Sequence, residues 1–162
     1  MRAALTCLEP ELTNVRIADL CPKAIMFRKD ERRVADPDPS GTQVVHLLPI
    51  LDPYPMGYKE RGRYLDPADH EAVFDRGGNI TSTILVAGRV IGVWDFEQEP
   101  HPCVKLYFFR DLSRLLRRKI HEEAERVGGF LADGPVRLRT CTGMTPLRLR
   151  GAGGFMSPLK GM

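Results

Sequence analysis

The sequence predicts an α+β domain built on a curved, mainly antiparallel β-sheet with one long amphipathic helix. Two observations lead to this prediction. Residues 80–96 form two β-rich runs separated by Ala87-Gly88, which is typical of a β-hairpin with a two-residue turn. Residues 111–127 carry apolar side chains at helical spacing. The complete predicted order is β, short α, β-hairpin, β, long α, β.

The N-terminal residues carry weak signals. Residues 15–19 alternate as in a short strand, residues 24–27 form a second apolar run, and Cys21-Pro22-Lys23 predicts a turn between them. Residues 36–43 combine two prolines, a glycine and small polar side chains, which indicates a linker. We therefore expect three parts: a short unit over residues 1–35, a linker over 36–43 and a β-rich domain over 44–162.

The β-rich domain begins with a predicted strand over residues 44–51, in which Pro49 marks the edge or the end. Residues 66–74 predict one or two helical turns, because Asp66 can cap the first turn and Pro67 suits the first helical position. Pro53, Pro55 and Gly57 brace and redirect the chain between these elements.

The second strand of the hairpin is apolar on both faces, which predicts a central position in the sheet. Gly92 in this strand leaves room for a close neighbour or a bulge. Further strands are expected over residues 103–109 and 136–141. Strict alternation divides the side chains of the hairpin strand between two faces: Val90, Gly92, Trp94 and Phe96 against Ile91, Val93 and Asp95.

The long helix is expected to begin with Asp111 as its N-cap and to stop at Gly128-Gly129. Its basic side chains lie in the first half and its acidic ones in the second, which opposes the helix dipole. Two interpretations stay open: a solvated face with tolerated charges, or a basic surface against a phosphate backbone. The charged residues are Arg114, Arg117, Arg118 and Lys119, then Glu122, Glu123 and Glu125.

The overall charge of +3 is too small to indicate nucleic acid, but the distribution is uneven. After Asp133 the sequence has five basic and no acidic side chains, a pattern that suits phosphate contact or simple solubility. We find no apolar run long enough to span a membrane and no signal peptide, so we expect a cytoplasmic protein without membrane contact. The four cysteines are then expected as reduced thiols.

The sequence offers no catalytic, cofactor or metal motif. Only His101 and Cys103 lie at a short spacing among the histidines and cysteines, so no metal is expected. The glycine-rich residues 151–154 follow no clear strand and open no helix, so they do not predict a phosphate-binding loop, and no cofactor is expected. We expect the single tryptophan, Trp94, to pack in the core.

The clearest basic segment is Tyr58, Lys59, Arg61, Arg63 and Tyr64, directly after the proline-braced turn. A braced loop with three cations and two tyrosines can present them to a polyanion. The simpler interpretation is an ordered surface turn with solvated charges.

Three segments carry a family resemblance: residues 46–67 (HLLPILDPYPMGYKERGRYLDP), 79–97 (NITSTILVAGRVIGVWDFE) and 153–161 (GGFMSPLKG). Together they resemble the C-terminal part of the winged-helix DNA-binding proteins of the AlkZ/YcaQ DNA-glycosylase family. The resemblance runs from about His46 to the C-terminus and is weak before it. It implies DNA repair, a barrel-like closure of the sheet, and a winged-helix remnant over residues 1–35.

The catalytic motif of that family is a glutamine placed two residues before a second glutamine or an aspartate. This chain has two glutamines, Gln43 and Gln98, which are followed at the second position by Val45 and Pro100. No catalytic residue can therefore be assigned, and whether the chain is an enzyme stays open. The family members are at least about twice as long, so the chain resembles a C-terminal portion.

Three functions are compatible with the resemblance. The first is a DNA-binding C-terminal domain that contacts the phosphate backbone of double-stranded DNA. The second is a shortened but active glycosylase for alkylated or crosslinked bases, and the third is a protein-interaction module that docks on a separate N-terminal catalytic half. For the first function, the candidate DNA-binding residues are Lys59, Arg61, Arg63, Arg148, Arg150 and Lys160.

Overall fold

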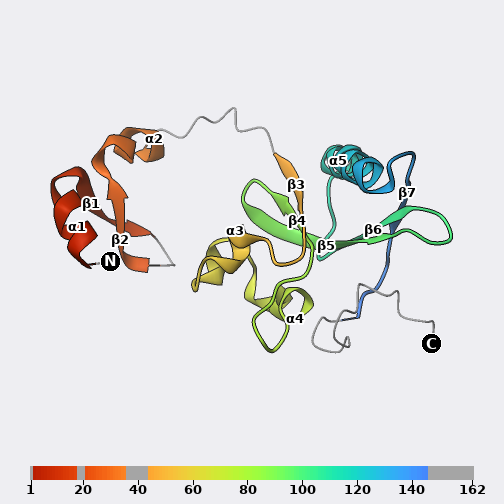
Figure 1. Cartoon of the computed structure of the whole chain (residues 1–162), viewed down its shortest axis with the longest axis horizontal. Helices are drawn as coiled ribbons and strands as arrows, with labels where there is room; N and C mark the ends of the chain where they lie inside the picture. Colours follow the sequence, from red (N-terminus) through yellow and green to blue (C-terminus); the bar gives the residue numbers. More distant parts are fainter. Residues whose placement is uncertain (1, 18–20, 36–43, 146–162) are drawn as a thin grey trace. The chain divides into compact units, whose positions relative to one another are not determined.

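The computed structural model describes residues 2–17, 21–35 and 44–145 (Figure 1). The chain divides into unit 1, residues 1–41, and unit 2, residues 42–162. Unit 1 has a sheet of two strands and unit 2 a sheet of five. The predicted α+β class is thereby confirmed.

Unit 1 is an antiparallel hairpin flanked by short helices. Leu12 pairs with Phe27 and Ile17 with Cys21, so Cys21-Pro22-Lys23 lies in a strand and the prediction of a turn there was wrong. A proline is tolerated because each strand of this hairpin has a single partner among the described residues. The elements are α1 (Arg2–Leu8), η1 (Glu9–Glu11), β1 (Leu12–Ile17), β2 (Cys21–Phe27), η2 (Arg28–Asp30) and α2 (Glu31–Ala35).

Unit 1 has no buried side chain over residues 5–17 and 23–35, the part in which its side chains are described. Ile25 is 54% exposed and Val34 66% exposed. Burial of apolar surface is the main favourable term in folding. The described side chains of unit 1 therefore supply little of the stabilisation that a folded domain needs.

Unit 2 is built on one open sheet with the strand order β3-β4-β5-β6-β7. The first three pairings are antiparallel, whereas β6 and β7 are parallel and are connected through the helix α5. Within the described residues β3 and β7 do not pair, so the barrel closure implied by the resemblance is not found. The strands are β3 (Val45–Leu48), β4 (Thr83–Val86), β5 (Arg89–Glu97), β6 (Cys103–Phe108) and β7 (Arg137–Thr140).

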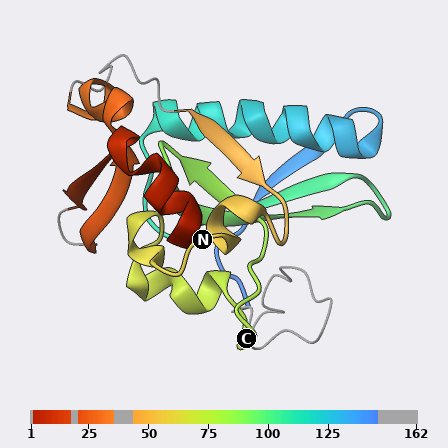
Figure 2. The same ribbon diagram turned by 60° about the vertical axis from the view of Figure 1, so that its left-hand side comes forward.

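The helix α5 (Arg114–Ala132) lies along one face of this sheet (Figure 2). Its buried residues Ile120 and Ala124 pack with sheet residues such as Val104 and Trp94. Trp94 is 7% exposed, and its Nε1 donates a hydrogen bond of 2.8 Å to the carbonyl oxygen of Leu48. The predicted core position of Trp94 is therefore confirmed.

Both predicted ends of the helix were wrong. The N-cap is Ser113, whose Oγ accepts a hydrogen bond from the Leu116 N–H, and the C-cap is Asp133 in the left-handed conformation. Gly128 lies within the helix, and its lack of a side chain lets the helix pack closely on the sheet. A Cβ at this position would lie 2.6 Å from a methyl carbon of Val104.

A bulge in β5 changes which side chains share a face. Ile84 pairs with Gly92 and Leu85 with Val90, so Ile91 is an extra residue in the strand. Val90 therefore joins the core on the face away from α5, and the prediction that it shares a face with Trp94 was wrong. Gly92 was expected to have a close neighbour or a bulge, and a bulge lies next to it at Ile91. The central position of this strand is confirmed.

The opposite face of the sheet is covered by a helical insertion between β3 and β4, residues 49–80, whose helices α3 and α4 are labelled in Figure 1. Its buried side chains Tyr64, Val73 and Phe74 pack on sheet residues that include Val93. The insertion contains α3 (Pro53–Met56), η3 (Arg61–Arg63), η4 (Pro67–Asp69) and α4 (His70–Val73).

Candidate nucleic-acid interface

Two capped turns shape the insertion. The carboxylate of Asp52 accepts a hydrogen bond of 2.8 Å from the Tyr54 N–H, and Pro53 starts the short helix α3. The carboxylate of Asp66 accepts one of 3.0 Å from the Ala68 N–H before η4. The predicted cap at Asp66 is confirmed, and the segment between these turns carries the candidate cations.

Arg63 forms an aromatic cluster with Tyr54 and Tyr58. Its guanidinium carbon lies 3.2 Å from the centroid of the Tyr58 ring and 5.9 Å from that of Tyr54. Tyr54 is 39% exposed and Tyr58 46% exposed, and their rings meet edge to face with the centroids 6.3 Å apart. Stacking of an arginine on a tyrosine fixes the cation in place while leaving surface on the rings available. We call Tyr54, Tyr58 and Arg63 the tyrosine–arginine cluster.

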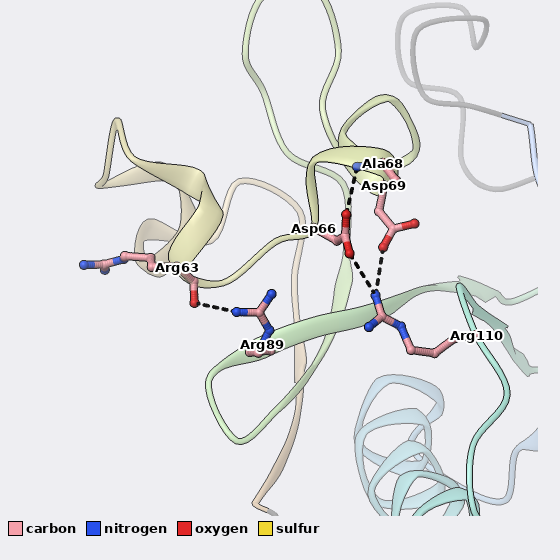
Figure 3. A network of polar contacts seen from close by, with 6 residues as sticks. All are labelled: Arg63, Asp66, Ala68, Asp69, Arg89 and Arg110. Carbon is pink, nitrogen blue, oxygen red and sulfur yellow. Dashed lines mark hydrogen bonds and ion pairs between the residues drawn. The ribbon is translucent and has the colours of Figure 1, made fainter. Parts of the chain in front are cut away.

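The backbone at Arg63 is tied to the sheet. Its carbonyl oxygen accepts a hydrogen bond of 3.4 Å from Nη1 of Arg89 on β5 (Figure 3). Tyr64, the next residue, is fully buried, and its hydroxyl donates a hydrogen bond of 2.7 Å to the carbonyl oxygen of Pro55. Burial raises the pKa of Tyr64 against the opposing effect of Arg61 and Arg63. The cluster therefore stands on a buried, hydrogen-bonded support.

Arg61 points into the insertion. Its guanidinium carbon lies 3.6 Å from the centroid of the Phe74 ring, and its Nη1 lies 2.7 Å from Nε2 of His70. The His70 ring in turn stacks on Phe74 with the ring centroids 5.2 Å apart. This cation is largely occupied by its own neighbours, whereas Lys59 is exposed.

Arg110 holds two carboxylates of the insertion, those of Asp66 and Asp69. Its Nη2 lies 3.2 Å from Asp69 and 3.9 Å from Asp66, which ties the insertion to the end of β6 (Figure 3). The pKa of Asp69 is raised by burial and by Asp66, while Arg110 opposes the rise. Sequence reasoning missed Arg110, because it lies 41 residues from Asp69 in the chain.

The remaining candidates are distributed as follows. Arg148, Arg150, Lys160 and Gln43 lie outside the described residues. Gln98 is exposed in the loop between β5 and β6. Among the described residues no group of three metal-ligating side chains converges, and no helix is long and apolar enough to cross a membrane.

A cavity of about 390 Å³ opens beside the cluster, on the edge of the sheet at β3. Its lining combines apolar side chains with His46 and Tyr54. The Tyr54 hydroxyl donates a hydrogen bond of 3.4 Å to the carbonyl oxygen of Gly88, which holds the ring at this edge. The arrangement can accept a flat or apolar group, but it contains no paired carboxylates for acid–base chemistry.

Comparison with known proteins identifies the family. The family model described as DNA glycosylase AlkZ-like matches residues 1–130. The chain belongs to the AlkZ-like DNA glycosylase family. This match includes residues 1–35, where the resemblance was weak, and it ends before residues 153–161, where a resemblance was noted.

The AlkZ-like fold is also seen in a solved structure, the Streptomyces sahachiroi DNA glycosylase AlkZ. That structure matches with a TM-score of 0.66 and 22% sequence identity over 86% of this chain. The match covers 36% of the AlkZ chain, so this chain spans about a third of its length. Comparison with curated protein sequences gave no match.

Proposed function

We propose that this chain is the DNA-binding C-terminal portion of an AlkZ-like DNA glycosylase and that it lacks the catalytic motif of the family. The observation that supports this function best is the tyrosine–arginine cluster beside the exposed Lys59. Family membership supplies the DNA-repair context. In a bacterial cell such a protein would act in the cytoplasm, on the nucleoid.

The cluster has the chemistry of a nucleic-acid contact. An arginine held flat on a tyrosine keeps its N–H groups in a fixed plane, which suits the oxygens of a phosphate. Exposed tyrosine rings can also stack on a nucleobase, and such stacking contributes about 1–3 kcal/mol per base. Lys59 adds a mobile positive charge at the same surface. These contacts give affinity and position without reading the sequence.

The proposed roles of the candidate cations differ. Arg63 and Lys59 make direct phosphate contacts, and Arg61 supports the insertion from within. Arg148, Arg150 and Lys160 contribute further positive charge, in keeping with the acid-free C-terminal part of the sequence. Phosphate contacts of this kind release counterions from DNA, so binding weakens as salt is added.

The test is the affinity of the full chain for duplex DNA, measured by fluorescence anisotropy over a series of salt concentrations. Replacing both Lys59→Gln and Arg63→Gln should flatten the slope of log affinity against log salt by about 0.9 for each phosphate that is no longer neutralised. Arg126→Gln is the matched control, because Arg126 is an exposed cation of α5 that is held by Glu123. Absent or salt-independent binding by the wild type would refute the proposal.

A second function is supported by unit 1, which exposes large apolar side chains. A hairpin preceded by a helix is what a winged-helix unit supplies at its C-terminal end, and the AlkZ chain is almost three times as long as the matched part. The apolar side chains would then cover a separate N-terminal half of an AlkZ-like protein.

Light scattering of the isolated chain over a range of concentrations tests this docking function. Association that increases with concentration, and that is reduced by Ile25→Ser and Val34→Ser, supports it. The exposed Glu31→Gln in unit 1 serves as a control and should leave association unchanged. A chain that stays monomeric at every concentration and binds DNA counts against it.

A further inference from the structure

The face of the unit 2 sheet away from α5 carries a row of charged residues at the β7 edge. Asp95 pairs with Lys105, and Lys105 pairs with Arg139, so these three side chains project from one face of adjacent strands. Glu97, Cys103 and Arg137 form the next row along the same strands. The insertion covers another part of this same face, where Val93 and Tyr107 belong to the core beneath the insertion.

A cavity of about 330 Å³ lies over these rows. Lys105 is its most buried cation, with a side chain that is 9% exposed, and its Nζ lies 2.9 Å from a carboxylate oxygen of Glu97. A buried lysine is costly unless a partner offsets its charge, and Glu97 supplies that partner. The cavity therefore has a charged base that is fixed by an ion pair.

Arg137 and Arg139 line the same cavity from the edge strand β7. Both are exposed, and neither forms an ion pair with another described residue. Burial raises the pKa of the Cys141 thiol, and the positive charges of Arg139 and Lys105 oppose this rise. Both cations therefore lie close enough to Cys141 to influence the same group. His101, from the loop between β5 and β6, also lines the cavity.

We propose that this cavity, lined by Lys105, Arg137 and Arg139, binds a phosphate group. The guanidinium groups of Arg137 and Arg139 can each donate two parallel hydrogen bonds to the oxygens of a phosphate. The three cations also outnumber the two carboxylates in these rows, those of Asp95 and Glu97. The phosphate belongs either to a nucleic-acid backbone or to free phosphate or a mononucleotide. The site shares no residue with the tyrosine–arginine cluster, so it stands whether or not that cluster contacts DNA.

The experiment compares the full chain with the variant Arg137→Gln/Arg139→Gln. The first arm measures the melting temperature with inorganic phosphate or adenosine monophosphate, using chloride at equal ionic strength as reference. The second arm measures the salt dependence of duplex DNA binding. Arg126→Gln is the matched control, because Arg126 is an exposed arginine of α5 that pairs with Glu123. Circular dichroism verifies that each variant is folded.

A rise in melting temperature that the wild type and Arg126→Gln show, and the double variant loses, identifies free phosphate or the mononucleotide as the ligand. No rise, together with a salt slope flatter by about 0.9 in the double variant alone, identifies the DNA backbone. If the double variant equals the wild type in both arms, the proposal is refuted. If the Lys59→Gln/Arg63→Gln variant loses DNA binding, the melting-temperature measurement with phosphate is unaffected. The proposal for this cavity and the proposal for the tyrosine–arginine cluster can therefore fail independently.

Discussion

Nη1 of Arg61 lies 2.7 Å from Nε2 of His70, and this contact selects one tautomer of the neutral imidazole. Arginine can only donate hydrogen bonds, so Nε2 must accept and the proton of the neutral ring resides on Nδ1. His70→Leu would leave the guanidinium without this acceptor, and we expect the free energy of unfolding to fall by about 1–3 kcal/mol. His70→Gln, which keeps an acceptor, should lose less. Equal losses in urea denaturation of both variants would contradict this role.

The raised pKa of Asp69 predicts a pH dependence of stability. Burial is its largest cause, so the folded state holds the proton more tightly than the unfolded chain, in which the pKa is near 3.8. This contribution to stability is present below that value and is lost as the pH rises through the folded pKa. Asp69→Asn cannot lose a proton. Its free energy of unfolding relative to the wild type should therefore rise as the pH increases from about 3.8 through the folded pKa of Asp69. A constant difference over this range would contradict the prediction.

Gly128 and Gly129 are neighbours in α5, and we expect opposite effects when each is changed to alanine. A Cβ at Gly128 would lie 2.6 Å from Val104 and 2.8 Å from Val136, so Gly128→Ala should destabilise by about 1–3 kcal/mol through overpacking. A Cβ at Gly129 would have its nearest contact at 3.5 Å, with the carbonyl oxygen of Gly134. Gly129→Ala should therefore stabilise by up to about 1 kcal/mol, since alanine favours helix. Thermal unfolding of both variants checks the contrast.

The isolated chain should not release bases from alkylated DNA. Neither of its glutamines stands in the motif of the family, and the described residues contain no acid–base pair that we can assign to the reaction. The measurement is base release from alkylated duplex DNA, with heat-denatured protein as the background. Release above that background would support the alternative of a shortened but active glycosylase.

The local parts of the fold could be predicted from the sequence. Ala87-Gly88 makes the tight turn between β4 and β5 with both residues at positive φ, and Asp66 caps the turn that it precedes. These features depend on a few consecutive residues, so the chemistry of the turns and caps determines them.

The features that depend on packing could not be predicted. In the sequence, Gly128 resembles a helix stop. In the structure it lets α5 approach Val104 on β6, which lies 24 residues earlier in the chain. The bulge at Ile91 reversed the face of Val90, because a single extra residue inverts an alternation. The same holds for the candidate site: the sequence pointed to Arg61 and Arg63, but the ring on which each lies was visible only in the structure.

The parallel pairing of β6 with β7 has a consequence for the order of folding. The hairpin of β4 and β5 and its pairing with β6 join neighbours in the sequence, whereas β7 reaches β6 only after the 19 residues of α5 have crossed the sheet. Pairings across longer loops form more slowly because more chain entropy is lost first. The cavity that holds Lys105, Arg137 and Arg139 therefore needs the docking of α5, and we expect it to form after the hairpin of β4 and β5.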